Sequence, residues 1–305
     1  MKWEKKGLIH YPKKNAFWNQ KYDILPVPYF LEDKNIVRVF FGTTDEENYG
    51  RITYIDLDAD NLNKIVYEHD NYIIGLGEDG TFDDCGIVPS CIIKKDDEYL
   101  LYTVGFQRTV KTPYMLFAGL TISKDLEQFT RFSNAPILPR NKFRYISQGA
   151  PCVLFDNNKY KMWHWYATKW VNIEGKLFMD YHIGYAESDD AINWEMREEP
   201  CLKPENNLGE FAVARPFVFK RNGIYHMYYS TRYIKDLYRI TYATSIDGLT
   251  WTRAKEKPFD ISNTGWDSEM TCYSSIIEIK SKTYMFYNGN NNGETGFGYA
   301  ELIEE

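Results

Sequence analysis

Cysteine and histidine are scarce in this chain, and long apolar runs are absent. Its 305 residues include five cysteines and five histidines, with neither a Cys-x-x-Cys pair nor a His-x-x-x-His spacing. We therefore expect reduced thiols, no metal site and no cofactor. No stretch approaches the roughly 20 apolar residues of a membrane helix, and no apolar segment follows the charged start of the chain. These absences predict a cytoplasmic protein without a membrane partner.

An excess of positive charge is also missing. Lys and Arg total 36 against 43 Asp and Glu, which gives a formal net charge of −7. Nucleic-acid binding requires a basic face that neutralises phosphates, so we expect no nucleic-acid partner. What the sequence has in abundance is aromatic side chains, 17% of all residues, with 25 Tyr and 8 Trp. This content is typical of a β-rich core or of a surface that stacks on sugar rings.

One pattern recurs five times along the chain: a strand that opens around a proline, a short polar turn, and a strand rich in aromatic residues. The landmark residues lie about 60 positions apart, at Pro28, Pro89, Pro151, Pro216 and, with serine in place of proline, Ser274. Such repeats predict an all-β, five-bladed β-propeller with four-stranded antiparallel blades. We expect a single domain over residues 1–305, with blades at residues 20–66, 83–132, 147–198, 210–255 and 267–303. Residues 1–15 are expected to supply the strand that closes the ring.

In an antiparallel blade, the start of the innermost strand and the end of the next strand open on the same face. Polar residues at these positions are therefore expected to share one crater. Three carboxylates there are candidate catalytic residues: Asp84 and Glu269 as base and stabiliser, and Glu210 as proton donor. Glycosyl transfer uses such groups because one acid protonates the leaving oxygen while an ionised partner activates the attacking group.

Substrate-binding residues are expected around the same crater. Arg215 and Arg232 are predicted to hold an anionic group, because a guanidinium binds carboxylate or phosphate through two parallel hydrogen bonds. The other candidates are polar or aromatic residues at strand starts and exits: Asp23, Asp45, Asp83, Arg108, Gln148, His164, Lys169, Trp170, Asp267, Tyr273, Asn288 and Asn290.

Each of these assignments has a structural alternative. Loops of any acidic protein carry Asp and Glu, and the arginines can pair with these acids as structural ion pairs. Aromatic residues that alternate along propeller strands are more often core than sugar platforms. A lone histidine such as His164 is more often a hydrogen-bonded structural residue than a ligand. If two arginines stay unpaired, the substrate carries an anionic group.

Several segments resemble the five-bladed propeller superfamily of glycoside hydrolase families 43, 32, 68 and 130, and in particular a bacterial group associated with surface-polysaccharide biosynthesis. These segments are Arg38–Gly42, Gly80–Gly86, Glu210–Pro216, Gly265–Met270 and Tyr287–Asn290. The resemblance extends over nearly the whole chain and implies carbohydrate chemistry.

The family-43 pattern implies a base Asp, a tuning Asp and an acid Glu on the first three blades. Asp23 and Asp84 match the first two, whereas the third blade has Gln148 where a glutamate is expected. Family-130 phosphorylases and related propeller mannosyltransferases resemble the chain better, because they also have basic residues near the acids. These relatives use phosphate or an activated sugar.

The sequence therefore predicts a carbohydrate-active enzyme of bacterial glycan metabolism. It would cleave or transfer a glycosyl group on a sugar that bears an anionic or activated group. One alternative is a phosphate-dependent phosphorylase or glycosyltransferase, and another is a lectin-like propeller that binds carbohydrate without catalysis. The expected partner is a small carbohydrate or a nucleotide sugar. The oligomeric state does not follow from the sequence.

Overall fold

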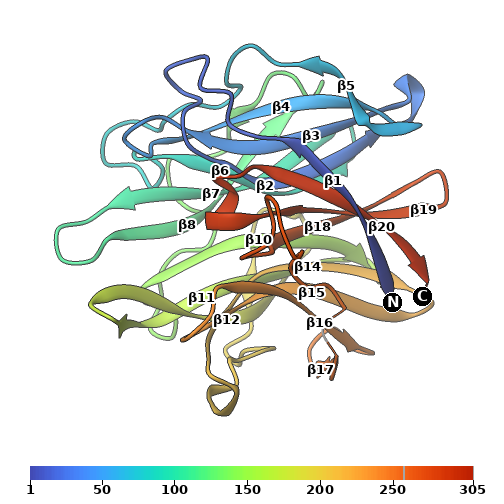
Figure 1. The fold of residues 1–305 in the computed structure, drawn as a ribbon. Coiled ribbons are helices and arrows are strands. Elements are labelled where there is room, and N and C mark those ends of the chain that lie inside the picture. Colours follow the sequence, from blue (N-terminus) through green and yellow to red (C-terminus); the bar gives the residue numbers. More distant parts are fainter. Residues whose placement is uncertain (257, 305) are drawn as a thin grey trace.

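The computed structural model describes residues 1–256 and 258–304, and its regular structure is almost entirely antiparallel β-sheet (Figure 1). Strands rich in Tyr, Phe, Val and Ile form because their side chains pack well on a pleated, half-buried surface. The helical elements of the described residues are short 3-10 turns: η1 (Glu32–Lys34), η2 (Asn206–Leu208) and η3 (Asn290–Gly293). No described helix is long and apolar enough to cross a membrane.

The strands follow one another in groups of four. The first group is β2 (Asp23–Leu31), β3 (Ile36–Thr44), β4 (Gly50–Asp58) and β5 (Asn61–Glu68). The second is β6 (Ile87–Lys95), β7 (Glu98–Arg108), β8 (Tyr114–Ser123) and β9 (Thr130–Arg131). The third is β10 (Ser147–Asp156), β11 (Lys159–Ile173), β12 (Lys176–Ser188) and β13 (Glu195–Met196). The fourth is β14 (Glu210–Arg221), β15 (Ile224–Tyr233), β16 (Tyr238–Ser245) and β17 (Thr252–Arg253).

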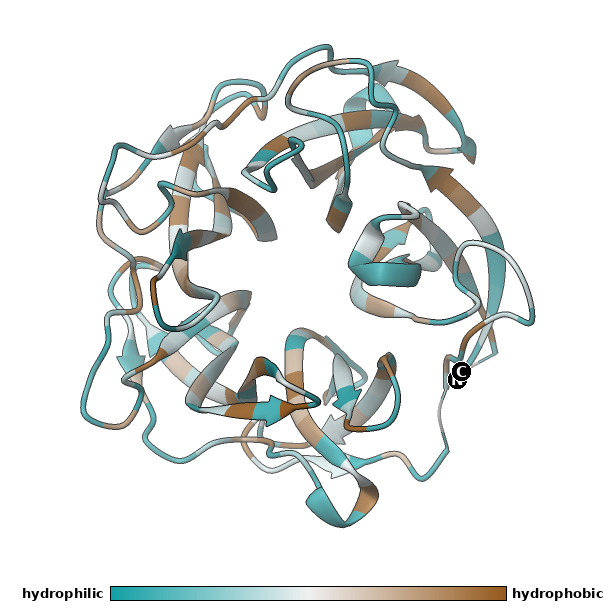
Figure 2. Cartoon of the chain, turned by 60° about the vertical axis from the view of Figure 1, so that its left-hand side comes forward, coloured by the Kyte–Doolittle hydropathy of each residue, from teal (hydrophilic) through white to brown (hydrophobic). Residues whose placement is uncertain are grey.

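The last sheet joins the two ends of the chain. It contains β18 (Cys272–Ile279), β19 (Lys282–Asn288), β20 (Phe297–Glu304) and β1 (Lys2–His10), and β1 pairs antiparallel with β20. The termini consequently lie side by side (Figures 1 and 2).

The sheets surround a common centre, which gives a propeller-like fold (Figure 2). The first strand of each group, β2, β6, β10, β14 or β18, contacts the first strand of the next, and β18 contacts β2. A parallel bridge between Gln148 and Phe117 joins the second and third groups into one sheet.

Four of these first strands carry a β-bulge that contains a residue with positive φ. The residues are Leu25 in β2 (φ 57°), Ala150 in β10 (φ 47°), Arg215 in β14 (φ 50°) and Tyr273 in β18 (φ 58°). A bulge inserts an unpaired residue and redirects its side chain. The same backbone irregularity thus recurs at equivalent places around the centre.

The proline landmarks coincide only partly with these bulges. Pro151 and Pro216 stand at equivalent positions, each directly after the positive-φ residue of β10 or β14. In β2 the bulge contains Leu25–Pro26. Pro28 instead pairs at a regular ladder position of its sheet, so it was the wrong landmark, whereas Pro89 borders a register shift between Pro89 and Cys91. Proline is tolerated at a bulge because the unpaired residue need not donate a ladder hydrogen bond.

Most of the abundant aromatic side chains pack between the sheets. Trp163, Tyr102, Tyr228 and Tyr287 are fully buried, and Trp163 packs edge-on against Tyr185 with ring centroids 5.5 Å apart. Large flat rings fill the wedge-shaped space between twisted sheets and bury much apolar area. The structure therefore confirms the prediction that most aromatic side chains belong to the core.

Candidate active site

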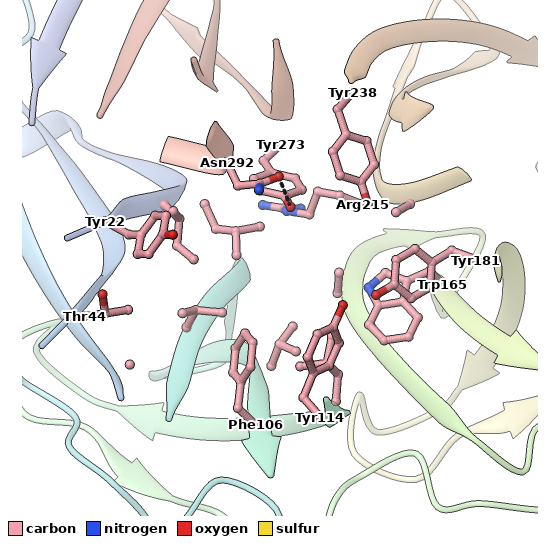
Figure 3. A pocket seen from close by; sticks show the side chains of 18 of the residues that line it. Tyr22, Thr44, Phe106, Tyr114, Trp165, Tyr181, Arg215, Tyr238, Tyr273 and Asn292 are labelled. Carbon is pink, nitrogen blue, oxygen red and sulfur yellow. Dashed lines mark hydrogen bonds between the residues drawn. The ribbon is translucent and has the colours of Figure 1, made fainter. Parts of the chain in front are cut away.

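Every group of strands contributes to one pocket of about 370 Å³ (Figure 3). Its wall includes Leu25 from β2, Val88 from β6, Ala150 from β10, Arg215 from β14 and Tyr273 from β18. All five lie near the starts of the first strands. These starts meet in one place, as the blade geometry predicted.

The bulges direct side chains into this pocket. Leu25, Ala150, Arg215 and Tyr273 are the four positive-φ residues, and all four line it. A left-handed conformation costs a non-glycine residue on the order of 1 kcal/mol and persists where the surrounding structure enforces it. Such residues cluster at binding and catalytic sites. The backbone therefore sets the inward direction of these side chains.

Arg215 is a buried cation that has no carboxylate partner in the described parts of the chain. Its exposure is 1%, and its Nη2 donates a hydrogen bond to Ser275 Oγ at 3.1 Å. Its Nε and Nη1 atoms have no hydrogen-bond partner within residues 1–256 and 258–304. Burial lowers the pKa of this guanidinium, but arginine remains protonated in proteins. Arg215 therefore brings two buried, unsatisfied donors to the wall of the pocket, and a guanidinium of this kind is suited to an anion.

Arg232 is held in the pocket by aromatic rings. Its Cζ lies 4.2 Å from the ring centroid of Phe178 and 5.1 Å from that of Tyr238. Cation–π contacts orient a guanidinium without neutralising its charge. No carboxylate of the described chain forms a salt bridge with Arg232. The pocket thus receives two arginines, from β14 and β15, and neither has an acidic partner among the described residues.

Tyrosine hydroxyls surround the two arginines. Burial raises the pKa values of Tyr181 and Tyr273 well above the ordinary value, and that of Tyr238 to about 12. These hydroxyls stay protonated at neutral pH and serve as hydrogen-bond donors. Tyr273 donates to Asn292 Oδ1 at 3.3 Å, beside Arg215 in Figure 3. The arrangement suits a ligand that carries hydrogen-bond acceptors.

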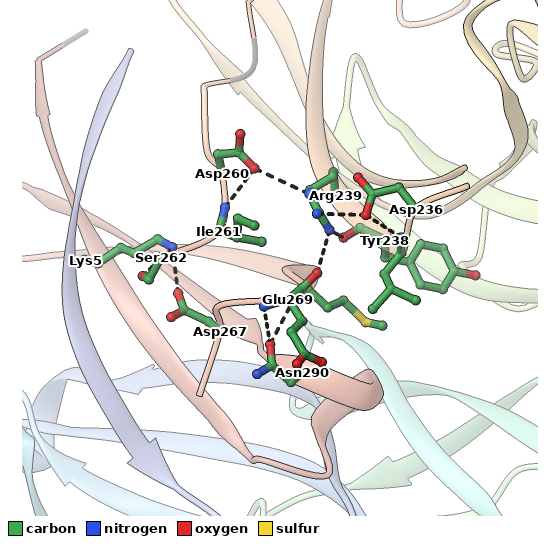
Figure 4. Close-up of polar contacts among 12 residues, drawn as sticks. Lys5, Asp236, Tyr238, Arg239, Asp260, Ile261, Ser262, Asp267, Glu269 and Asn290 are labelled. Carbon is green, nitrogen blue, oxygen red and sulfur yellow. Dashed lines mark hydrogen bonds and ion pairs between the residues drawn. The ribbon is translucent and has the colours of Figure 1, made fainter. Parts of the chain in front are cut away.

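No Asp or Glu is among the described residues that line the pocket. Three predicted acids instead form buried ion pairs with cations from the outer strand of their own group. The pairs are Asp83–Arg131 (2.7 Å), Glu210–Arg253 (2.8 Å) and Asp267–Lys5 (2.6 Å); Figure 4 shows the last of them. These acids attach the start of each first strand to β9, β17 or β1.

Asp23 occupies the corresponding place in the first group, next to a histidine. His10 Nδ1 lies 2.8 Å from Asp23 Oδ2, and His10 Nε2 lies 3.3 Å from Glu68 Oε1. Burial by itself lowers the pKa of His10, but hydrogen bonds to both carboxylates raise it to about 9. The hydrogen bond from His10 lowers the pKa of Glu68 to about 2. This cluster joins the end of β1 to β2 and β5.

Asp84 lies outside the pocket lining and forms no ion pair with a cation of residues 1–256 and 258–304. Its Oδ2 accepts a hydrogen bond from the backbone N of Gly80 at 3.0 Å. Its Oδ1 is buried and has no partner in the described parts of the chain. The next residue, Cys85, donates from its backbone N to the carbonyl of Phe106, which lines the pocket. Among the three candidate catalytic acids, Asp84 alone has a buried oxygen without a partner in the described residues, and its neighbour Cys85 is bonded to a residue of the pocket wall.

Glu269 lies outside the pocket lining, with an exposed side chain (Figure 4). Its backbone N donates to Asn290 Oδ1 at 2.8 Å, and its carbonyl accepts from Arg239 Nη1 at 2.8 Å. The structure therefore does not bring Asp84, Glu210 and Glu269 together around one point. Glu210 is committed to its ion pair, and Glu269 faces solvent.

The remaining predicted residues also lie outside the pocket lining, and most make structural contacts. Those contacts are Asp45 with Arg51 (2.9 Å), Arg108 over Tyr49 (4.1 Å), Gln148 with the Pro139 carbonyl (2.8 Å), His164 with Arg144 (3.2 Å), Trp170 against Tyr114 (5.7 Å), Asn288 with the Asp23 carbonyl (2.8 Å) and Asn290 with the Gly265 carbonyl (3.2 Å). Lys169 is exposed, and its backbone N donates to Asp180. Burial lowers the pKa of His164 to about 3, so its imidazole is neutral.

The sequence reasoning missed several polar and aromatic residues of the pocket. They are Tyr22, Thr44, Asn48, Tyr114, Tyr181 and Tyr238. Tyr114 and Tyr238 are the first residues of β8 and β16, the third strands of their groups. Third-strand starts lie next to second-strand exits, so an aromatic residue at this repeat position was the available signal.

Comparison with known proteins agrees with this architecture. The chain is 33% identical to the uncharacterized protein Rv1502 of Mycobacterium tuberculosis strain H37Rv, over 99% of each protein. The chain belongs to the same family as Rv1502. Residues 171–295 match the glycoside hydrolase family 130 model, described as beta-1,4-mannooligosaccharide phosphorylase.

Solved structures share the fold at low sequence identity. A glycosyl hydrolase from Bacteroides ovatus superposes with a TM-score of 0.78 at 14% identity, over 98% of this chain and 93% of that one. A structure from work on glycoside hydrolases of family 130 that target beta-1,2 mannosidic linkages in Candida mannan has a TM-score of 0.74 at 13% identity, with 98% and 93% coverage. Part of the chain is therefore similar to a family of glycoside phosphorylases, and solved glycoside hydrolases share its fold.

Proposed function

We propose that the protein is a glycoside phosphorylase, in which phosphate bound by Arg215 and Arg232 attacks the anomeric carbon of a sugar. The observation that carries this proposal is the buried guanidinium of Arg215, which has two donor atoms and no carboxylate partner for them within residues 1–256 and 258–304. A buried cation of this kind is stabilised when an anion binds.

The composition of the pocket favours phosphorolysis over hydrolysis. Hydrolysis by a carboxylate pair requires two acids about 5 to 10 Å apart around the scissile bond. The lining formed by the described residues contains no acid. Phosphate supplies the nucleophilic oxygen itself, so a single proton donor completes the reaction.

We assign that proton donor to Asp84. A phosphate oxygen forms a bond to the anomeric carbon while the bond from this carbon to the glycosidic oxygen breaks. The glycosidic oxygen takes the proton of Asp84, and Asp84 regains a proton from the hydrogen phosphate. The products are a sugar 1-phosphate and a sugar shortened by one unit. The buried, unsatisfied Oδ1 of Asp84 supports this role.

Substrate screening by mass spectrometry tests the proposal. The purified protein is incubated with manno-oligosaccharides, with and without inorganic phosphate, beside the variants Arg215→Met and Arg197→Met. Arg197 is an exposed arginine on another surface and serves as the matched control. We expect sugar 1-phosphate only when phosphate is present, and loss of the product in Arg215→Met alone. A product released without phosphate would instead favour hydrolysis or transfer of a sugar that carries its own anionic group.

For the fold, we propose that the five groups of strands are the blades of one closed five-bladed propeller over the whole chain. The contacts between successive first strands and the pairing of β1 with β20 support this interpretation. A nucleotide-sugar substrate, a cytoplasmic location and a role in surface-polysaccharide biosynthesis stay predictions from the sequence.

A further inference from the structure

A second cavity, called the outer groove below, lies between the first and second groups of strands. Its volume of about 760 Å³ is about twice that of the pocket, and no residue lines both. The edge strands β5 and β9 contribute to it, together with η1, β3, β4 and the segments at 69–73 and 127–129. The lining residues are Lys34, Ile36, Arg38, Tyr54, Asp56, Tyr67, His69, Asn71, Tyr72, Ile73, Glu127, Gln128, Phe129 and Thr130.

The charges of the outer groove are matched, unlike those of the pocket. Arg38 and Asp56 form two parallel hydrogen bonds, Nε to Oδ1 and Nη2 to Oδ2, each 2.8 Å long, and both residues are 4% exposed. Arg38 Nη1 donates to the carbonyl of Leu126 at 3.1 Å and lies 3.9 Å from Glu127 Oε1. A guanidinium whose donors are used in this way is not available to an anion. Lys34 and Glu127 add one charge of each sign, so the groove favours an uncharged ligand.

Tyr67 forms an anchored aromatic platform in the outer groove. Its side chain is 45% exposed, and its hydroxyl lies 3.0 Å from His69 Nδ1. The His69 ring stacks on Tyr54 with centroids 4.7 Å apart and planes 17° apart, and Tyr54 is buried beside Arg38. A single exposed aromatic ring is ordinary, but this one is tied through His69 to a buried stack. Its orientation is therefore fixed before a ligand binds, which lowers the entropic cost of stacking.

Neutral polar side chains line the same groove. The amides of Asn71 and Gln128 and the hydroxyl of Thr130 can each donate and accept hydrogen bonds. A sugar unit has hydroxyls that also donate and accept, and a C–H face that packs on an aromatic ring. An apolar partner would leave the two amides without partners, which costs free energy. The combination of an aromatic platform with neutral donors and acceptors therefore suits a carbohydrate.

We infer that the outer groove is a second carbohydrate-binding site, which holds a neutral oligosaccharide chain on the ring of Tyr67. The inference rests on the proposed function for the choice of ligand, a manno-oligosaccharide. In that function the pocket holds phosphate and the reacting sugar unit, so a cavity of about twice its volume has space for more than one unit. A chain bound in the outer groove stays at the enzyme and raises the local concentration of chain ends.

Calorimetric titration with β-1,4-mannohexaose in the absence of phosphate tests this inference. Tyr67 is half-exposed, so Tyr67→Ala leaves the core intact, and we expect it to weaken binding by at least about 5-fold. Arg215→Met removes the anion ligand of the pocket but preserves the outer groove, and we expect it to bind mannohexaose as the native protein does. Tyr145→Ala is the matched control, because Tyr145 is 56% exposed and lines neither cavity.

The outcomes separate the inference from the proposed function. Equal affinity of Tyr67→Ala and the native protein overturns the inference, and so does the absence of binding by the native protein. Loss of binding in Arg215→Met alone also overturns it, because the glycan then binds only in the pocket. If mannohexaose and phosphate yield no sugar 1-phosphate while binding still depends on Tyr67, the outer groove is a carbohydrate site and the proposed function fails.

Discussion

Arg215, the most buried arginine of the pocket, donates a hydrogen bond from Nη2 to Ser275 Oγ at 3.1 Å. This is the one hydrogen bond of its guanidinium within the described residues. The serine hydroxyl satisfies one donor but cannot balance the charge, so the guanidinium has an electrostatic deficit that an anion would relieve. An uncompensated buried charge at a pocket lowers the stability of the folded protein and favours the binding of an anion.

Replacing Arg215 with methionine is therefore expected to stabilise the protein. Removal of a buried, uncompensated charge should raise the free energy of unfolding by about 1–3 kcal/mol and abolish stabilisation by phosphate. Urea denaturation with and without phosphate measures both effects. Arg253→Met is the contrasting variant, because it leaves buried Glu210 without its cation and should destabilise the protein. Equal destabilisation by the two variants would show that Arg215 has only a structural role.

Glu210→Gln is expected to affect stability rather than catalysis. Both Glu210 oxygens accept hydrogen bonds from Arg253 Nη1, at 3.0 and 2.8 Å, and one accepts from the backbone N of Glu205. Breaking a buried ion pair by removing one partner costs about 3 kcal/mol or more. Urea denaturation should show this loss, while kcat/KM per folded molecule stays within about 3-fold. If Glu210→Gln had normal stability but no activity, Glu210 rather than Asp84 would be the proton donor.

Asp84→Asn is expected to affect catalysis rather than stability. Asparagine preserves the acceptor for Gly80 but cannot donate the proton at the scissile bond. Loss of a general acid lowers kcat by about 100- to 10,000-fold, and we expect the free energy of unfolding to change little. Steady-state phosphorolysis and urea denaturation measure the two quantities. Asp97→Asn, at an exposed turn, is the control; full activity of Asp84→Asn would refute the assignment.

The cluster of His10, Asp23 and Glu68 should make stability depend on pH. Hydrogen bonds to the two carboxylates outweigh burial and raise the pKa of His10 from 6.5 to about 9. The folded state thus holds this proton more tightly than the unfolded state. The stabilisation is complete below pH 6.5 and is lost as the pH rises through 9, by up to about 3 kcal/mol.

Urea denaturation between pH 6 and 10 measures this loss, and the variant His10→Gln should remove its histidine-dependent part. Groups facing His10 from the neighbouring elements include the rings of Phe41 and Phe297, and Lys13 pairs with Glu68 from the solvent side. An identical pH profile for the native protein and His10→Gln would contradict the prediction.

Part of the pocket was predictable because the repeat identifies equivalent positions. Arg215 and Tyr273 stand at the same point of β14 and β18, and both line the pocket. The repeat does not reveal the bulge, however, because a positive φ at arginine or tyrosine leaves no composition signal. In β2 the mistaken choice of Pro28 shifted the landmark away from Leu25, which is the residue that lines the pocket.

The predicted acids lie outside the pocket lining for a different reason. Asp83 lies 48 residues from Arg131, and Asp267 lies 262 residues from Lys5. Whether an acid at a strand start faces the pocket or the outer strand depends on which cation the returning chain places beside it. Residue spacing carries no information about such partners, so the sequence predicted a catalytic cluster although five of these acids form structural contacts.

The sequence by itself determined the repeated β-architecture and the convergence of the strand starts, because hydrophobic periodicity and turn chemistry are local properties. It also identified Arg215 and Arg232 as candidate ligands of an anion. Only the tertiary structure decided which charged groups stay unpaired. Long-range ion pairs remove Asp83, Glu210 and Asp267 from the pocket, whereas burial without an acid leaves the charge of Arg215 available to a ligand. Pairing and burial arise from contacts between distant segments, and these form only when the chain folds.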